Sequence, residues 1–291
     1  MTAPLTAFDN DGLRFRVHDW GPADSRSGTA APAEGRSVIA LHGFPQTALS
    51  WERVAARLTS AGVRVLAPEQ RGYSPDARPR EVSAYTMDKL AGDVLALADA
   101  AGWERFDVLG HDWGGAVAWY LGSRHADRVR TVSVASTPHP AALWEAFKGP
   151  QALRSWYMLL FQLPWLPETL LGAGSGRLAS RMFAASGAED PAAMGRLLSD
   201  RTTATGALNW YRTMRVKGAP GAGRVSVPSL YVWSDGDAAL GRQAAERTRD
   251  FVDGDYTFVE LAGASHWIPD ERPDELAAAV LAHLERHPEE A

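Results

Sequence analysis

The sequence predicts an α/β fold, in which helices flank a mostly parallel sheet and a helical segment is inserted between two strands. Short runs rich in Val, Leu and Ile alternate with amphipathic stretches in the first and last parts of the chain. These runs are apolar throughout, which is typical of strands buried on both faces of a parallel sheet. Between residues 138 and 222 the alternation stops, and no strand is predicted there.

Six apolar runs are predicted as strands. In chain order they are Ser37–Leu41, Val63–Ala67, Phe106–Gly110, Val129–Ala135, Ser229–Ser234 and Tyr256–Leu261. The amphipathic stretches that follow strands are predicted as helices, and they span Ser50–Ala61, Thr86–Ala101, Gly114–His125, Arg242–Val252 and Pro273–His287. Thr86 is a residue type that caps helix N-termini. Leu13–Trp20 alternates more strongly and is predicted to be an antiparallel strand at the edge of the sheet.

The segment from residue 138 to residue 222 is rich in Trp, Leu, Met and Ala and is predicted to be helical. Pro and Gly interrupt it at Leu163–Pro167 and Gly172–Gly176. The second interruption is predicted to be a loop and not a phosphate-binding site, because no strand precedes it. We therefore predict a core formed by residues 1–137 and 223–291. Residues 138–222 are predicted to form a helical lid at the carboxyl edge of the sheet, where ligands bind in such folds.

The composition excludes several classes of chemistry. The 291 residues include no Cys, which excludes disulfides, thiolate metal sites and a Cys nucleophile. The 30 basic and 35 acidic side chains give a net charge of -5 without clustering, so nucleic acid is not an expected partner. The N-terminus lacks the pattern of a secretory signal, and no apolar run is long enough to span a membrane. We expect a cytoplasmic protein with no membrane partner.

The most specific motif lies at Val108–Gly115, with the sequence Val-Leu-Gly-His-Asp-Trp-Gly-Gly. A predicted strand ends at Gly110 and a predicted helix begins near Gly114, so Asp112 lies in a sharp strand-to-helix turn. A nucleophile elbow has this arrangement, in which glycines allow the tight turn and the central side chain projects above the sheet. The alternative is an Asp that only caps the helix that follows.

An Asp in an elbow favours a particular reaction. A carboxylate is already an anion at neutral pH, and it can attack an sp3 carbon that bears a leaving group, forming an ester on the enzyme. A second group must then activate water to hydrolyse that ester. The N-terminus of the helix after Asp112 favours negative charge at this position.

Asp237 and His266 are the predicted partners of Asp112, in the chain order nucleophile, acid and His. Asp237 follows a predicted strand, and His266 lies in the loop after the last one. Asp235 is the alternative acid, but it can instead serve the turn that follows it. A single loop His is more often a solvated residue, so the catalytic interpretation depends on its combination with two acids.

An oxyanion hole is expected beside the elbow. The backbone amides of Phe44 and Trp113 are predicted to form it, because the His42–Pro45 loop follows the first of the apolar strands. His42 is interpreted as a structural residue of this loop, and Pro45 is compatible with a cis peptide bond.

His283 and His287 have the spacing of helical metal ligands but lack a third ligand. Both are interpreted as solvated residues of an exposed terminal helix. No metal site is predicted.

Five motifs resemble those of α/β-hydrolases of the epoxide hydrolase branch, and the resemblance covers essentially the whole chain. They are His42–Pro45, Gln70–Ser74, Gly110–Gly115, Gly236–Asp237 and Ser265–Trp267. The resemblance implies an α/β-hydrolase fold with an inserted helical cap, and the conversion of an epoxide and water to a vicinal diol through an aspartyl ester. It implies no metal or organic cofactor. One departure is the absence of the additional Gly that is common in the family after the Arg-Gly-Tyr segment, which leaves the conformation of that loop open.

In epoxide hydrolases, two tyrosines of the lid hold and protonate the epoxide oxygen. The segments around Tyr157 and Tyr211 resemble the two segments that carry them. The alternative for each is ordinary packing in the lid, since buried Tyr side chains need only one polar partner. The proposed role is chemically reasonable, because an opening epoxide releases an alkoxide that needs a proton. The expected partners are therefore a small apolar epoxide and water.

A haloalkane dehalogenase is the main rival interpretation, because it would use the same Asp112, Asp237 and His266. Trp113 could donate its indole N–H to a halide, and a second donor could come from Trp144, Trp156 or Trp165. Phe44 counts against a dehalogenase, because one group of these enzymes has a halide-binding Asn there.

Three further classes of protein fit the residues less well. A fluoroacetate-type dehalogenase would have Arg at the position of Trp113, and a serine hydrolase would need a Ser in an elbow. A receptor that binds small apolar molecules without catalysis would not need the acids and the His. The oligomeric state is open, and a homo-oligomer is compatible with the sequence.

Overall fold

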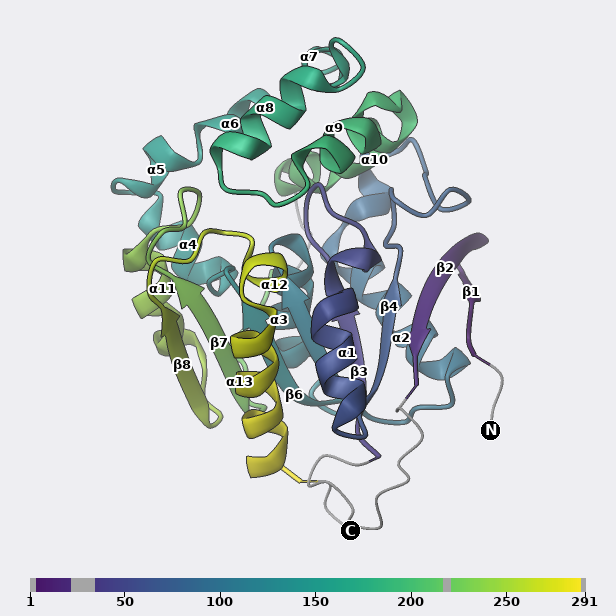
Figure 1. Cartoon of the computed structure of the whole chain (residues 1–291), viewed down its shortest axis with the longest axis vertical. Coiled ribbons are helices and arrows are strands. Elements are labelled where there is room, and N and C mark those ends of the chain that lie inside the picture. The colour runs from purple at the N-terminus through teal and green to yellow at the C-terminus, as the bar shows by residue number, and fades with distance from the viewer. Residues whose placement is uncertain (1–3, 22–34, 217–220, 289–291) are drawn as a thin grey trace.

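The computed structural model describes residues 4–21, 35–216 and 221–288. Within them, eight strands form one sheet in the order β1-β2-β4-β3-β5-β6-β7-β8 (Figure 1). The strands are β1 (Ala7–Asn10), β2 (Leu13–Trp20), β3 (Ser37–Leu41), β4 (Arg64–Pro68), β5 (Phe106–His111), β6 (Val129–Ala135), β7 (Ser229–Ser234) and β8 (Tyr256–Leu261). The strands from β4 to β8 in this order are parallel. The predicted fold class is confirmed.

The antiparallel prediction for Leu13–Trp20 is confirmed, because β2 pairs in that sense with both β1 and β4. Its predicted place at the edge is wrong. β1 is the edge strand, and it was missed because only one of its four residues, Phe8, is buried. A four-residue strand with a single buried side chain shows no alternation of apolar and polar residues from which it could be predicted.

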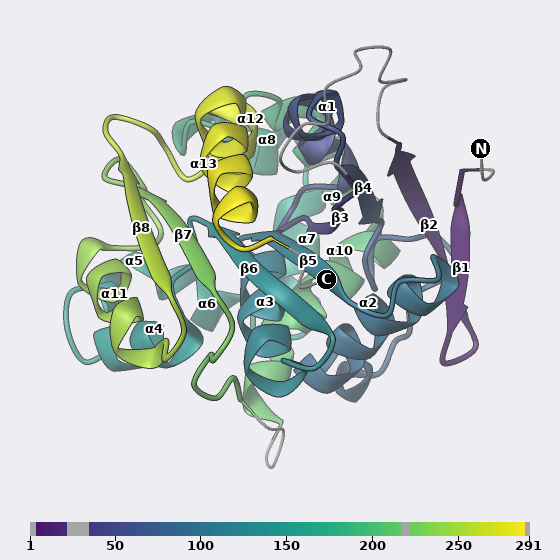
Figure 2. The same ribbon diagram turned by 90° about the horizontal axis from the view of Figure 1, so that it is seen from below.

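Helices cover both faces of the sheet (Figure 2). Those of the core are η1 (Ala48–Trp51), α1 (Glu52–Ser60), η2 (Val82–Tyr85), α2 (Met87–Ala100), α3 (Trp113–Arg124), α11 (Arg242–Arg247), η4 (Thr248–Phe251), α12 (Ile268–Glu271) and α13 (Pro273–Arg286). Side chains of β3 alternate between two buried clusters. Val38 and Ala40 join the cluster under α1 and α13, whereas Ile39 and Leu41 join the cluster under α2 and α3.

Two predicted helices differ in their end turns. The helix predicted at residues 50–61 begins as the 3-10 turn η1, and the one predicted at residues 242–252 ends as η4. In the second case the Thr248 hydroxyl donates to the carbonyl of Ala244 and accepts from the amide of His139. Thr86 does occupy an N-cap position, but its side chain makes no capping hydrogen bond.

The segment between β6 and β7 contains helices joined by turns and loops, and no strand of the sheet lies in its described part. Residues 217–220 of this segment, and residues 1–3 of the chain, lie outside the described residues. Its helices are α4 (Pro140–Ala146), α5 (Gln151–Arg154), α6 (Trp156–Leu160), α7 (Leu166–Gly172), α8 (Arg177–Ala185), α9 (Pro191–Ser199), α10 (Arg201–Arg212) and η3 (Thr213–Arg215). Helices α5 to α10 lie above one end of the sheet, and α4 lies beside α11 (Figure 1). The Gly172–Gly176 stretch ends α7 and turns into α8, as predicted for a loop.

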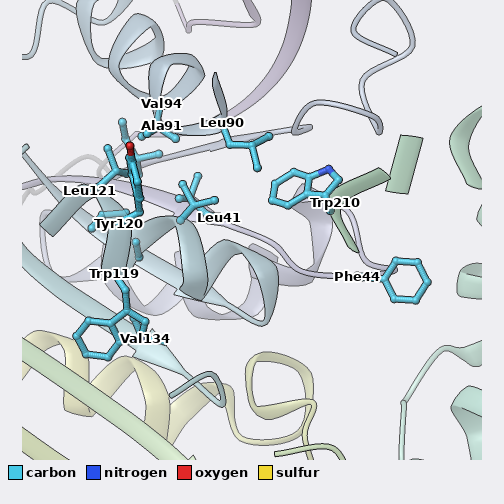
Figure 3. Close-up of a cluster of buried hydrophobic side chains, with 14 of the residues drawn as sticks. Leu41, Phe44, Leu90, Ala91, Val94, Trp119, Tyr120, Leu121, Val134 and Trp210 are labelled. Atoms are coloured by element: carbon cyan, nitrogen blue, oxygen red, sulfur yellow. The ribbon is translucent and has the colours of Figure 1, made fainter. Parts of the chain in front are cut away.

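The inserted helices share a hydrophobic cluster with the core. Leu208 and Trp210 of α10 belong to the same buried cluster as Leu41 and Val117 (Figure 3 labels Trp210, Phe44 and Leu41). The Trp210 indole also donates to the carbonyl oxygen of Arg71, at 2.9 Å. Burial and this hydrogen bond together fix the inserted helices over the sheet. No helix of the described residues has the length and apolar character needed to cross a bilayer.

Candidate active site

Asp112 lies between the end of β5 and the start of α3, with φ of 51° and ψ of -121°. A positive φ is strained for a residue with a side chain, and such strain is typical of functional turns. The turn is tight, since a Cβ on Gly114 would overlap the carbonyl group of Leu41. Although Asp112 occupies the N-cap position of α3, its side chain makes no capping hydrogen bond. The alternative of a simple capping Asp is therefore wrong.

The Asp112 carboxylate is held from one side by the His42–Pro45 loop. The amide of Phe44 donates to Oδ1 of Asp112 at 2.7 Å, and the Phe44–Pro45 peptide bond is cis. A Cβ on Gly43 would overlap the Asp112 side chain, so only glycine allows this approach. The amide of Trp113 makes no hydrogen bond to Asp112 within the described residues, and its share in an oxyanion hole stays a prediction.

His42 is fully buried and has a partner for each ring nitrogen. Nδ1 lies 3.1 Å from the carbonyl oxygen of Gly43, and Nε2 accepts from the amide of Gln70 at 3.2 Å. Burial lowers the pKa of His42, so the ring is neutral at physiological pH. These contacts agree with a structural role in the loop.

His266 lies between two carboxylates. Its Nδ1 is 2.7 Å from Oδ2 of Asp237, and its Nε2 is 3.6 Å from Oδ2 of Asp112. Oδ1 of Asp237 accepts from the amides of Ala239 and Leu240 at 2.7 and 2.9 Å. Both oxygens of Asp237 are thus engaged, and the carboxylate is fixed toward the imidazole.

Asp235, the alternative acid, does not reach His266. Its Oδ1 accepts from the amide of Gly263 at 2.6 Å, which joins the turn after β7 to the loop after β8. The structure therefore brings together the three predicted residues, Asp112, Asp237 and His266, and separates Asp235 from them.

The charges of these groups shift their protonation. Burial opposes the charged form of His266, but Asp237 and Asp112 outweigh it and raise the pKa of the imidazole to about 10. Burial likewise opposes the carboxylate form of Asp112, but the hydrogen bond and charge of His266 lower its pKa. In the resting protein at neutral pH, an imidazolium therefore lies between two carboxylates.

Tyr157 of α6 and Tyr211 of α10 line the cavities beside Asp112 from the inserted helices. Their ring centroids are 6.2 Å apart, and the Tyr211 ring packs at 5.0 Å against Trp113 and at 5.3 Å against Phe44. Burial, followed by the charge of Asp112, raises the pKa of both phenols well above 10. Both groups are therefore protonated at neutral pH and can donate.

Two cavities meet at these residues, since Asp112, Tyr157 and Tyr211 line both of them. One cavity, of about 190 Å³, extends past Trp113 to Leu143 and is called the Leu143 cavity. The other, of about 300 Å³, extends past His266 to Phe183 and is called the Phe183 cavity. The Asp112 carboxylate is thus accessible to a small molecule from two directions.

The tryptophans considered as halide donors are dispersed. Trp113 and Trp144 line the Leu143 cavity, and Trp156 lines the Phe183 cavity. Trp165 is 62% exposed and lines neither of these cavities.

Several residues that support the site were not found from the sequence. His111 Nε2 and the Ser136 hydroxyl both bind the carbonyl oxygen of His266, at 2.9 and 2.7 Å. Burial, with the charge of His266, lowers the pKa of His111 to about 4, so its ring is neutral and donates through Nε2. The Gln162 amide donates to the carbonyl oxygen of Tyr211 at 2.9 Å. All of these pairs are far apart in the chain, and no local motif indicates them.

The interpretation of His283 as a solvated residue is wrong, because its side chain is fully buried. His283 lies on the same face of α13 as Leu276, Val280 and Leu284, and this apolar spacing was a readable indication of burial. His287 is partly buried and lies 3.1 Å from Asp255. No group of three or more potential metal ligands occurs in the described part of the chain.

The chain is similar to known proteins over nearly its whole length. A family model described as alpha/beta hydrolase fold matches residues 36–273. Epoxide hydrolase A of Mycobacterium tuberculosis is 35% identical, with 98% of each chain covered. The AB hydrolase superfamily protein YfhM of Bacillus subtilis is 32% identical, covering 94% of this chain and 99% of the relative. The crystal structure of epoxide hydrolase A from Mycobacterium thermoresistibile has a TM-score of 0.77 and 30% identity, with 97% of this chain and 98% of that one covered.

The fold, the elbow and these similarities identify the chain as a member of the α/β hydrolase fold family. Within it, the chain belongs to the epoxide hydrolase branch, to which several of its similar relatives are assigned by name.

Proposed function

We propose that the protein is an epoxide hydrolase that forms a diol through an ester on Asp112. The observation that carries this proposal is that Asp112, Tyr157 and Tyr211 line the same two cavities, with His266 3.6 Å from the carboxylate. A nucleophile and two proton donors therefore face one space that a small molecule can enter. The names of the relatives support the same reaction.

In the first step, Oδ2 of Asp112 attacks an epoxide carbon and the ring C–O bond breaks. Oδ2 is the attacking atom because Oδ1 is held by the Phe44 amide. The ring oxygen takes a proton from Tyr157 or Tyr211, which gives a hydroxyalkyl ester and a tyrosinate. Since burial strongly disfavours a tyrosinate here, the phenol must regain a proton quickly.

The proton that restores the phenol comes from the His266 imidazolium. Alkylation of Asp112 removes one of the two carboxylate charges that raise the pKa of His266, so the imidazole gives up its proton more readily. The resulting neutral imidazole then takes a proton from water, and the hydroxide attacks Cγ of Asp112. Charge on Oδ1 is stabilised by the amides of Phe44 and Trp113.

Collapse of this intermediate expels the diol oxygen, which takes one proton of the water. The other proton remains on His266, and the Asp112 carboxylate is regenerated. The resting ion pair of Asp112 and His266 is thus restored, and no metal or organic cofactor takes part.

Isotope labelling tests the covalent path. A single turnover of styrene oxide in ¹⁸O-water, with enzyme in excess, should give an unlabelled diol and one ¹⁸O atom in the peptide that contains Asp112. An ¹⁸O atom in the first diol would show that water attacks the epoxide directly, and would overturn the ester mechanism.

Halide release from a panel of haloalkanes, measured beside diol formation, distinguishes an epoxide hydrolase from a haloalkane dehalogenase. We expect diol without halide, because the tyrosine pair serves an oxygen leaving group. If the variant Asp112→Ala retains the biological activity of the protein, this would instead favour a receptor that binds small apolar molecules and catalyses no reaction.

We further propose that residues 138–222 act as the cap of a core formed by residues 1–137 and 223–291. The substrate is proposed to be small and largely apolar, and the protein cytoplasmic.

A further inference from the structure

The large apolar side chains at the surface are concentrated in the inserted helices. Eleven such side chains are exposed within the described residues, and all but Leu49 lie between Trp144 and Met214. Helix α6 consists of five apolar or aromatic residues, Trp-Tyr-Met-Leu-Leu, yet none of them is buried. Apolar side chains gathered on one part of a surface are typical of a site of interaction.

Five of these side chains lie on helices that flank one opening. Trp156 of α6 and Met182 of α8 are both exposed, and both line the Phe183 cavity. Leu159 is one turn after Trp156, and Leu178 is one turn before Met182, so each lies on the same side of its helix as that residue. Leu153, three residues before Trp156, is 80% exposed. We call Leu153, Trp156, Leu159, Leu178 and Met182 the outer cap face; α6 and α8 lie above the end of the sheet (Figure 1).

Binding of a small molecule at Asp112 does not account for the outer cap face. Leu153, Leu159 and Leu178 line neither the Leu143 cavity nor the Phe183 cavity. Their exposure therefore calls for a partner that is larger than a ligand of these cavities.

The charges around the outer cap face are positive. Between residues 146 and 188 the only acidic residue is Glu168, which is buried and paired with Arg212 at 2.8 Å. The basic residues of this stretch are all exposed, and within the described ranges no carboxylate lies at ion-pair distance from any of them. They are Lys148, Arg154, Arg177 and Arg181. Because the whole chain has a net charge of -5, this positive surface is a local feature.

Helix α8 shows how cations and apolar groups are combined. Arg177 and Arg181 each directly precede a residue of the outer cap face, Leu178 and Met182, and the two members of each pair are one turn apart. Only Ala179 of this helix is buried. A helix that presents Arg and apolar side chains side by side to its surroundings is suited to the boundary between lipid headgroups and acyl chains.

We propose that the outer cap face binds the surface of a bilayer that contains anionic lipids. Trp and Leu would enter the interfacial region, where Trp is enriched in membrane proteins, and the cations would contact phosphate groups. A second copy of this chain is a poorer occupant. Two-fold symmetry would bring the same arginines face to face, with no exposed acid between residues 146 and 188 to compensate them.

Binding at a bilayer surface needs no spanning helix, so the proposal departs only from the expectation that no membrane is a partner. It does not depend on the proposed function. Because Trp156 and Met182 also line the Phe183 cavity, binding would bring that cavity close to the lipid, where apolar molecules concentrate.

The test measures co-sedimentation of the full-length protein with vesicles. One set of vesicles contains equal parts of phosphatidylglycerol and phosphatidylcholine, and the other contains phosphatidylcholine alone. We expect binding to the anionic vesicles to be tighter by about tenfold or more, since each basic side chain near an anionic surface contributes a factor of about five. Added NaCl should weaken this binding, because salt screens exposed charges.

Two double variants locate the binding surface. Arg177→Gln/Arg181→Gln should weaken binding to the anionic vesicles by about 10- to 30-fold. Arg105→Gln is its control, because Arg105 is an exposed arginine that precedes β5, at the opposite end of that strand from Asp112.

The apolar part of the face is tested separately. Leu153→Gln/Leu159→Gln should weaken binding by about tenfold or more, through the loss of apolar contact with lipid. Leu49→Gln is its control, since Leu49 is exposed and lies outside the inserted helices. All substituted side chains are exposed, so each variant should keep the unfolding temperature of the wild type.

Three results would overturn the proposal. The first is a wild-type protein that stays in the supernatant with anionic vesicles. The second is unchanged binding in both double variants, which would place the contact on another surface. The third is a dimer without lipid that Leu153→Gln/Leu159→Gln dissociates, which would show that a second copy covers this face. Styrene oxide hydrolysis, measured without vesicles, tests the proposed function independently of all three.

Discussion

The amide of Phe44 and the Oδ1 atom of Asp112 are 2.7 Å apart, and His266 approaches the other carboxylate oxygen. The two oxygens of one side chain therefore have different surroundings before any substrate arrives. In the proposed mechanism, the first becomes the carbonyl oxygen of the ester, and the second forms the new bond to the substrate. That mechanism makes the alkylation and the hydrolysis of Asp112 depend on different neighbouring groups, which substitutions can separate.

Replacement of His266 by Gln should trap the ester. Alkylation of Asp112 needs no base, whereas hydrolysis of the ester needs the imidazole to activate water. We expect intact-protein mass spectrometry to show a protein heavier by the mass of one epoxide, and diol formation to fall by about 100-fold or more. The same variant carrying Asp112→Asn is the control, and it should gain no mass. Wild-type rates of diol release from His266→Gln would contradict the assigned role.

Replacement of Asp237 by Asn should slow turnover, because the carboxylate orients His266 and supports its positive charge. We expect kcat to fall by about 100-fold or more. Asp235→Asn is a close control, since Asp235 bonds the Gly263 amide and not His266. Equal losses in the two variants, measured by steady-state diol formation, would show that the acid was assigned wrongly.

Replacement of either tyrosine of the pair by Phe should lower the rate of Asp112 alkylation by about 10-fold or more, because one proton donor to the ring oxygen is lost. The double variant Tyr157→Phe/Tyr211→Phe should be nearly inactive. Stopped-flow measurements of the tryptophan fluorescence change on alkylation separate this step from hydrolysis. Tyr256→Phe, on β8, is the control. If Asp112 is alkylated at the wild-type rate in the double variant, the two tyrosines are not proton donors and only pack in the lid.

The stability of the fold should fall as pH rises from 7 to 9. His266 has a pKa of about 10 in the folded protein and about 6.5 when unfolded, so the folded state binds the additional proton in this range. Its stabilising contribution is complete below about pH 6.5 and is lost as pH approaches 10, at up to about 1.4 kcal/mol per pH unit. Thermal unfolding followed by circular dichroism should show this slope in the wild type and lose it in His266→Gln.

The pH range of this effect is bounded by other groups. Buried tyrosines with raised pKa values add a slope of the same sign above about pH 10, and buried histidines with lowered pKa values add the opposite slope below about pH 6.5. A wild-type protein whose unfolding temperature is constant from pH 7 to 9 would show that His266 is neutral in the resting state.

Local sequence was sufficient for features that depend on neighbouring residues. The strands were predictable because burial on both faces leaves an apolar run, and the elbow because Gly110, Gly114 and Gly115 surround one acid. β1 could not be predicted, because its pattern of buried and exposed residues is too short. The 3-10 turn at Thr248 could not be predicted either, because a hydrogen bond with His139, far away in the chain, fixes it.

The candidate site was likewise predictable only where local sequence determines it. Asp237 and His266 follow strand ends, so their convergence on Asp112 follows from a parallel sheet. His111 and Ser136 bind the His266 carbonyl across 155 and 130 residues of chain, and no spacing rule reports such a contact.

The junction of two unlike cavities at Asp112 also has a stereochemical consequence. A meso epoxide has two mirror-related carbons, and attack at one or the other gives opposite enantiomers of the diol. In a symmetric site both attacks would be equally fast. On the proposed function, the two halves of such a molecule would enter spaces of about 190 and 300 Å³ with different walls. Handedness in the product would therefore originate in the shape of the protein, even where the substrate has none.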